Sequence, residues 1–116
     1  MVMIIYGIKN CDTVKKAQKY LQEKDISYEF HDYKKLGISK EKLSEWCDVV
    51  GWQVLLNKRG TNWRNLSDYI KNSVVDKESD INIMLSNHSI IKRPVLEKGD
   101  LLIVGFDLDQ FDKLAS

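Results

Sequence analysis

The stretch VMIIYGIKNCDTVKKAQKYLQEKDISYEFHD, residues 2–32, indicates the fold. Its opening run, residues 2–6, is short and continuously apolar, as in a strand that is buried on both faces. After a loop, Asp12 or Thr13 is suited to cap a helix that ends near residue 24. Residues 28–32 alternate in the manner of a second strand. Strand, helix and strand in this order form a βαβ unit, so the two strands are expected to be parallel.

The middle of the chain, from about residue 37 to residue 87, has a helical pattern throughout. Ser39 is expected to cap a helix that stops at Gly51, because its apolar residues follow the i, i+3, i+4, i+7 spacing. Further helical pieces are expected in three places: residues 53–57, residues 61–73 with Thr61 or Asn62 as the cap, and residues 76–86. This block is predicted to be a helical insertion.

The end of the chain returns to strands. Two short apolar runs within residues 93–104 flank a glycine-containing turn, which is typical of a hairpin. Asp107 is expected to cap a closing helix whose apolar residues point inward, namely Leu108, Phe111 and Leu114. The order is therefore βαβ, a helical block and ββα. We predict an α/β fold in a single domain over residues 1–116, with its core in residues 1–36 and 88–116 and one sheet covered by helices.

Composition restricts the class of protein. A chain of 116 residues with 43% hydrophobic and 30% charged residues is expected to fold as one domain. Eighteen basic residues oppose 17 acidic ones, so a protein held to nucleic acid by phosphate contacts is not expected. Two cysteines are too few for a disulfide framework, and neither a membrane span nor a signal peptide is recognisable. We expect a cytoplasmic protein without membrane partners.

Cys11 stands between the first strand and the first helix. The N-terminus of a helix carries a partial positive charge and unpaired N–H groups, which favour the thiolate form of a cysteine. Lys15, one helical turn on, and the adjacent Lys16 add positive charge, whereas Asp12 opposes a second negative charge. The position therefore predicts a reactive nucleophile; the alternative is a small inert cysteine at the end of a strand.

Cys47 is expected to have a different role. It falls on the apolar side of its helix beside Trp46, which favours a buried structural cysteine over a redox partner. A disulfide with Cys11 would require Cα atoms within about 7 Å, which the sequence does not decide.

The segment NKRGTNWR, residues 57–64, groups three basic side chains with two amides and a tryptophan. It is suited to bind an anion or a carboxylate through arginine forks and backbone N–H groups, or is simply a solvated loop. Arg93 and Pro94, the single proline, precede a strand, where a surface charge and a trans peptide bond are the general expectation. His31 and His88 have no partners at metal-ligand spacing, so no metal is expected.

Three segments in order carry a family resemblance: YGIKNCDTVKKA at residues 6–17, LLNKRGTNWR at residues 55–64 and IKRPV at residues 91–95. Together they resemble the arsenate reductase (ArsC)/Spx family, and its YffB-like branch in particular. The resemblance covers essentially the whole chain. It implies a thioredoxin-like fold, with a mixed four-stranded sheet and a helical insertion between the second and third strands. It also implies that Pro94 is a cis proline facing the nucleophile Cys11.

The resemblance further implies roles for the residues around the thiol. Lys15, Arg59 and Arg93 would stabilise the thiolate or hold an anion, while Asn10 and Pro94 would dock a thiol partner. That partner would be glutathione, as a co-substrate, or a protein of the glutaredoxin or thioredoxin type; no bound cofactor is implied.

Three functions follow from this resemblance. The first is a thiol-dependent oxidoreductase. The second is a Spx-like regulator that binds the RNA polymerase α subunit, although Val14 replaces the second cysteine of the Cys-x-x-Cys motif. The third is a glutaredoxin-linked arsenate reductase. That function is disfavoured because Asn57 replaces one oxyanion-binding arginine and residues 103–106 lack another.

Overall fold

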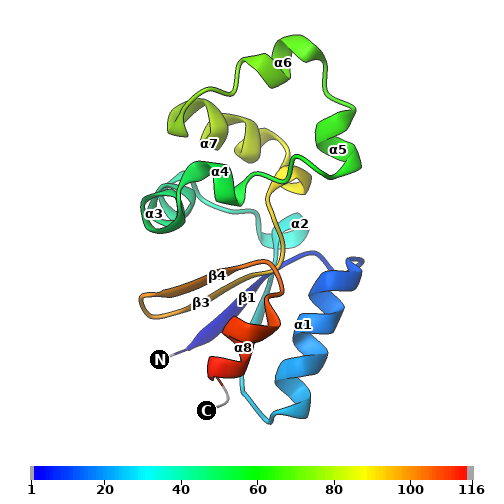
Figure 1. The fold of residues 1–116 in the computed structure, drawn as a ribbon, viewed down its shortest axis with the longest axis vertical. Coiled ribbons are helices and arrows are strands. Elements are labelled where there is room, and N and C mark those ends of the chain that lie inside the picture. Colours follow the sequence, from blue (N-terminus) through cyan, green and yellow to red (C-terminus); the bar gives the residue numbers. More distant parts are fainter. Residues whose placement is uncertain (1, 115–116) are drawn as a thin grey trace. The chain divides into compact units, whose positions relative to one another are not determined.

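The computed structural model describes residues 2–114. In chain order, the elements are β1 Met3–Gly7, α1 Asp12–Glu23, β2 Glu29–Asp32, α2 Tyr33–Leu36, α3 Lys40–Val50, α4 Trp52–Leu55, α5 Thr61–Arg64, α6 Asp68–Asn72, α7 Lys77–Ser86, the 3-10 turn η1 His88–Ile90, β3 Val95–Lys98, β4 Leu101–Val104 and α8 Leu108–Leu114 (Figure 1). They form two compact units. The sheet unit contains the chain up to Leu36 and from Arg93 onward, and the helical unit is Gly37–Lys92.

The sheet unit has the predicted mixed four-stranded sheet, with the strand order β2-β1-β3-β4. The strands β1 and β2 are parallel, as a βαβ unit requires, and β1 with β3 and β3 with β4 are antiparallel. Gly7 lies opposite Asp32 and Tyr6 lies opposite Val95. The carboxyl ends of β1 and β2 and the start of β3 therefore meet at one end of the sheet.

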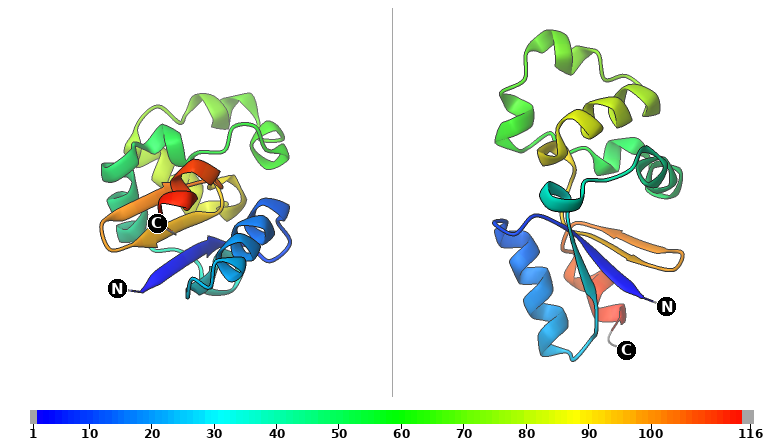
Figure 2. Two further views of the ribbon diagram at one scale, coloured as in Figure 1. Left: turned by 60° about the horizontal axis from the view of Figure 1, so that its bottom comes forward. Right: turned by 180° about the vertical axis from the view of Figure 1, so that it is seen from behind.

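One face of this sheet is covered by both α1 and α8, which lie on the same side of the strands in the two views of Figure 2. The buried residues of this layer are Met3, Ile5, Ala17, Leu21, Leu96, Ile103 and Phe111. Burying such side chains contributes about 1.5–3 kcal/mol each, so this layer is a main source of stability for the unit. The predicted inward position of Leu108 is wrong, because α8 packs through Phe111 while its first residue projects into solvent.

The helical unit packs α3, α4 and α7 against one another. Ser39 caps α3 as predicted, accepting a hydrogen bond from the N–H of Lys42 at 3.0 Å. The predicted helix over 61–73 is two helices, α5 and α6, because Ser67 accepts from the N–H of Ile70 and begins a new one. The predicted cap of the first piece is also wrong, since Gly60 occupies that position.

Residues 88–92 belong to the helical unit, although the sequence placed them with the sheet. Backbone hydrogen bonds explain this difference. The N–H of Asn57 donates to the carbonyl of Ile90 at 2.8 Å, and the N–H of Lys92 donates to the carbonyl of Leu55 at 2.7 Å. These bonds flank a β-bridge between Leu56 and Ile91 and tie the segment to the end of α4.

Residues 2–114 contain neither a helix suited to span a membrane nor a cluster of metal-ligating side chains. No helix there has both the length and the apolar character to cross a membrane. Nor do three His, Cys, Asp or Glu side chains in this range gather as a metal site would need.

Candidate functional site

Cys11 is the N-cap residue of α1. The sequence predicted Asp12 or Thr13 as the cap of this helix, and that prediction is wrong, because both residues lie within the first turn of α1. The backbone of Cys11 is extended, with φ −121° and ψ 120°, and its carbonyl accepts the N–H of Lys15 at 3.0 Å. Its thiol makes no capping hydrogen bond and is partly exposed. The sulfur thus lies at the positive end of the helix, where an anion is stabilised.

Gly7 sets how closely α1 approaches β1. A Cβ atom at this position would lie 2.7 Å from Cγ2 of Val14, which is nearer than real Cβ atoms come. Val14 is fully buried in the first turn of α1. The absence of a side chain at Gly7 therefore allows the first turn of the helix, and Cys11 before it, to sit close to the end of β1.

The polar residues around Cys11 are exposed. Asn10 and Asp12, its immediate neighbours, and Lys15, one turn further on, all reach solvent. Lys15 forms no ion pair with any residue in the described range 2–114. Its ammonium group is therefore available to an incoming anion or to the thiolate.

Arg93 and Pro94 lie at the same end of the sheet as Cys11. Pro94 is buried directly before β3, and its carbonyl accepts the N–H of Gly105 at 2.7 Å. The Arg93–Pro94 peptide bond is cis. Because β3 starts opposite Tyr6, near the end of β1, the topology brings the loop that carries Cys11 and the segment before β3 together. Of the predicted site residues, Asn10, Cys11, Lys15, Arg93 and Pro94 all belong to this unit.

Tyr33 is a site residue that the sequence did not reveal. It is fully buried at the start of α2, directly after β2, and its ring stacks against that of Tyr6 at 6.3 Å. Burial raises the pKa of Tyr33 well above its usual value, and the positive charge of Arg93 opposes that rise. The positive charge of Arg93 therefore acts on the neutral phenol of Tyr33. Only the pairing of β2 beside β1 brings these residues into one cluster.

Cys47 has the structural environment that the sequence predicted. It lies on α3 with 6% of its surface exposed, and burial together with the charge of Asp80 raises the pKa of its thiol to about 11. Both cysteines are free thiols. Cys47 is therefore protonated at neutral pH and shielded from reagents.

We expect iodoacetamide to alkylate Cys11 at least about tenfold faster than Cys47 at pH 7, because a thiol with a pKa near 11 is only about one part in 10,000 thiolate. Peptide mass spectrometry at timed intervals measures both rates in one sample. Cys11→Ser and Cys47→Ser identify the two signals. Equal or reversed rates would contradict the assignment of Cys11 as the nucleophile.

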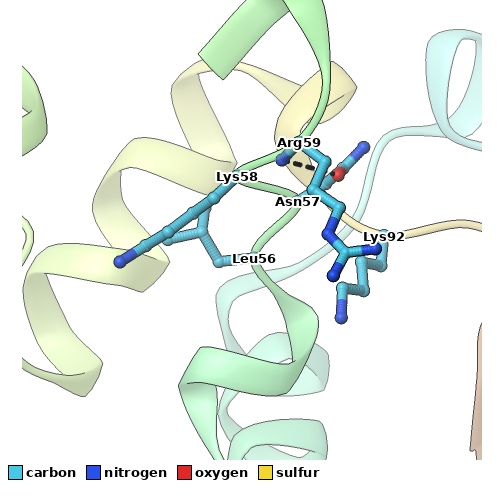
Figure 3. Close-up of a pocket in the computed structure, with 5 residues that line it drawn as sticks. All are labelled: Leu56, Asn57, Lys58, Arg59 and Lys92. Atoms are coloured by element: carbon cyan, nitrogen blue, oxygen red, sulfur yellow. Dashed lines mark hydrogen bonds between the residues drawn. The ribbon is translucent and has the colours of Figure 1, made fainter. Parts of the chain in front are cut away.

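Arg59 belongs to the helical unit and not to the unit that holds Cys11. It is exposed on the loop after α4, where its backbone N–H donates to Oδ1 of Asn57 at 3.3 Å. A cavity of about 380 Å³ opens there, lined by Leu56, Asn57, Lys58, Arg59 and Lys92 (Figure 3). The sequence singled out the basic segment but not Lys92, which the bridge between Leu56 and Ile91 brings to it.

The ArsC family model matches residues 6–114, almost the whole chain. The chain belongs to the ArsC family. An uncharacterized protein of Haemophilus influenzae is 40% identical over 110 residues, covering 95% of this chain and 96% of the relative. The solved structure of a YffB protein is 44% identical with a TM-score of 0.94, covering 99% and 100% of the two chains. An arsenate-reductase-related protein of Brucella melitensis is 45% identical with a TM-score of 0.78, covering 97% and 93%.

These relatives confirm the family that the three sequence segments resembled, and they favour its YffB-like branch. The global transcriptional regulator Spx of Lactiplantibacillus plantarum is a more distant ArsC-like relative, 22% identical over 94% of this chain and 83% of its own. The family's thioredoxin-like architecture agrees with the strand order observed here.

Proposed function

We propose that this ArsC-family protein is a thiol-dependent oxidoreductase with Cys11 as its nucleophile and glutathione, or a thiol protein of the glutaredoxin or thioredoxin type, as its partner. The observation that carries this proposal is the placement of Cys11 as an unbonded N-cap thiol at the end of the sheet where Arg93 and Pro94 also lie. Membership of the ArsC family supports it. A cytoplasmic location suits this chemistry, because thiols there stay reduced.

The proposed reaction needs one cysteine, since Val14 stands three residues after Cys11. The thiolate of Cys11 attacks the glutathione sulfur of a mixed disulfide. A new bond forms between that sulfur and Sγ of Cys11, the substrate's own disulfide bond breaks, and the substrate leaves as a thiolate that takes a proton from water. A second glutathione thiolate then attacks the same glutathione sulfur. Glutathione disulfide leaves and the Cys11 thiolate is regenerated. Per turnover, one mixed disulfide and one reduced glutathione give the free substrate thiol and one glutathione disulfide.

The neighbouring residues have distinct roles in this proposal. The helix N-terminus and Lys15 stabilise the thiolate of Cys11. Arg93 holds a carboxylate of glutathione, since a guanidinium matches the geometry of a carboxylate. Asn10 and the backbone at Pro94 dock the extended partner.

A titration of the ¹⁵N-labelled protein with reduced glutathione tests this proposal. We expect the amide signals of residues 10–15, of Arg93 and of Val95 to shift together and to saturate. Arg93→Met should weaken the binding about tenfold, because a charge-assisted hydrogen bond is lost. The exposed Lys98→Met, at the far end of β3, is the matched control and should bind as the wild type does. Shifts confined to other surfaces would contradict the proposed thiol partner.

The alternative function is a Spx-like regulator that binds the RNA polymerase α subunit. The observation that favours it is the similarity to Spx of L. plantarum along 94% of this chain. A pull-down with the purified α subunit separates the two functions. Binding that Cys11→Ser retains, together with no reductase activity of the wild type, would favour the regulator.

Arsenate reduction is a further alternative, suggested by the arsenate-reductase-related protein of B. melitensis. Residues 103–106 offer no arginine, whereas a multiply charged oxyanion requires several converging cations. The expected result is no arsenate-dependent oxidation of glutathione in the presence of glutaredoxin.

A further inference from the structure

Four exposed lysines lie at the same end of the sheet unit as Cys11. One is in the loop before α1, one is on α1 itself, and two are on α2, which directly follows β2. Because Gly7 lies opposite Asp32, the loop after β1 and the helix after β2 start from the same end of the sheet, as Figure 1 also shows. These residues, here called the lysine surface, are Lys9, Lys16, Lys34 and Lys35.

The positive charge of the lysine surface is not neutralised by ion pairs. None of its four ammonium groups pairs with an acidic residue of the described range 2–114. Further along α1 the situation differs, because Nζ of Lys19 lies 3.9 Å from Oε1 of Glu23. Helical side chains tilt toward the N-terminus of their helix, so that of Lys16 is directed toward the end that holds Cys11. Uncompensated positive charge therefore gathers at this end.

The acidic residues near the lysine surface are few and are mostly engaged in turns. Oδ1 of Asp32 accepts the backbone N–H of Lys34 at 2.9 Å. Both carboxyl oxygens of Asp107 accept hydrogen bonds from Gln110. Asp12 is exposed at the start of α1 and forms no ion pair with any residue between 2 and 114. These carboxylates leave the four lysines available to a partner.

The opposite end of the sheet unit has more acidic than basic residues. Since β2 runs parallel to β1, α1 ends and β2 begins there, and the turn between the antiparallel β3 and β4 lies there too. The charged residues of these segments are Glu23, Asp25, Glu29 and Asp100, against Lys24 and Lys98. The sheet unit is thus electrically polarised, with its positive end where the thiol of Cys11 is partly exposed. Such a field attracts a negatively charged partner and orients it on the surface.

We propose that the lysine surface docks an acidic polypeptide segment that carries the disulfide attacked by Cys11, an inference that rests on the proposed function for the role of the thiol. Two lysines come from the segment after β1 and two from the segment after β2, so a partner needs several acidic side chains to meet them all. An extended acidic segment of a protein supplies them. The surface uses neither Lys15 nor Arg93, and it therefore adds a choice of substrate to the chemistry proposed above.

A polypeptide fits this surface better than a nucleic acid does. A nucleic acid brings no disulfide to Cys11. Proteins that bind single strands also stack the bases on aromatic side chains, whereas Tyr6 and Tyr33, at the ends of β1 and β2, are both buried. The whole chain has a formal net charge of only +1, so the positive charge at this end is a local feature.

Binding of a fluorescent peptide tests the surface without relying on chemistry at Cys11. The peptide has aspartate and glutamate on both sides of a central serine. We expect saturable binding by fluorescence anisotropy at about 10 mM salt and its loss at about 1 M salt, because the Debye length falls from about 30 Å to about 3 Å. The double variant Lys34→Glu, Lys35→Glu should weaken the binding at least about tenfold, since like charges then face each other.

Lys98→Glu is the matched control, because Lys98 is an exposed lysine of the same unit at the opposite end of β3. It should bind the peptide as the wild type does, and thermal unfolding verifies that every variant is folded. The proposal is overturned if the acidic peptide does not bind or if Lys98→Glu weakens binding as much as the double variant. It is equally overturned if a single-stranded oligonucleotide of the same charge binds as tightly as the peptide.

Turnover separates this surface from the proposed function. The substrates carry a glutathionylated cysteine in place of the serine, flanked either by acidic residues or by serine and glycine. At about 10 mM salt, we expect kcat/KM to be at least about tenfold higher for the acidic peptide, and the double variant should lose this preference while still turning over the neutral peptide. Charge-dependent binding without turnover would support the surface and refute the thiol chemistry. Turnover without any charge preference would support the thiol chemistry and overturn the surface.

Discussion

Replacing Cys11 with Ser is expected to lower the turnover of glutathione mixed disulfides by on the order of 1,000-fold or more, because a serine hydroxyl forms no disulfide intermediate. The fold should not suffer from this change. Cys11 is the N-cap of α1, where its thiol makes no hydrogen bond, and serine is among the preferred residues at that position. The free energy of unfolding is therefore expected to stay the same or to rise by about 0.5–1 kcal/mol.

Opposite effects on activity and stability make this substitution informative. Turnover is measured with a glutathionylated peptide and reduced glutathione, and stability is measured by urea unfolding. Cys47→Ser is the matched control, since Cys47 is buried on α3, and it should keep the turnover while losing some stability. Substantial turnover by folded Cys11→Ser, or its loss in folded Cys47→Ser, would refute the assigned nucleophile.

Asp80 is expected to make the stability of the protein fall as the pH rises from about 4 to about 7. Its side chain on α7 is fully buried, and neither carboxyl oxygen has a hydrogen-bond partner among residues 2–114. Burial raises the pKa of this group from 3.8 to about 7, which the charge of Lys58 only partly offsets. The folded protein thus binds this proton more tightly than the unfolded chain does.

The sign of the effect follows from that difference. Well below pH 4 the carboxyl is protonated in both states, so the stabilising contribution is fully present. That contribution is lost as the pH rises toward 7, where the unfolded chain has already ionised and the folded chain must bury a charge. A difference of about three pKa units corresponds to a loss on the order of 4 kcal/mol across this window, with no further change from this group above it.

Two substitutions separate this effect from others. Asp80→Asn keeps the shape but cannot ionise, so the fall in the free energy of unfolding from pH 4 to pH 8 should shrink by several kcal/mol. Asp80→Leu should remove the same pH dependence and be the more stable of the two at pH 8, because leucine needs no hydrogen bond when buried. The measurement is urea unfolding at a series of pH values. A pH dependence that persists unchanged in both variants would show that Asp80 is not its source.

The elements and their order could be predicted from the sequence because hydrophobic periodicity and capping are local. The apolar run at residues 2–6, most of which forms β1, the Ser39 cap and the stop at Gly51 depend on neighbours only a few positions away. The same holds for Cys11, whose position between a strand and a helix places it at a helix N-terminus. Errors occurred where short segments competed, as between α5 and α6, where a second cap at Ser67 ended one helix and started another.

Only the tertiary structure decided which distant residues share a site. The charge of Arg93 acts on Tyr33 because β2 and β3 both flank β1. Lys92 and Arg59 line one cavity because a backbone bridge joins Leu56 to Ile91. The sequence did not predict the burial of Asp80 either, since a charged residue in a helix normally faces solvent. The local sequence around each residue thus determined its secondary structure, and it also identified Cys11 as the predicted nucleophile. The charge environment around each group depended on packing. The electrostatic energy of a group is set by its distance to other charges and by how much water lies between them.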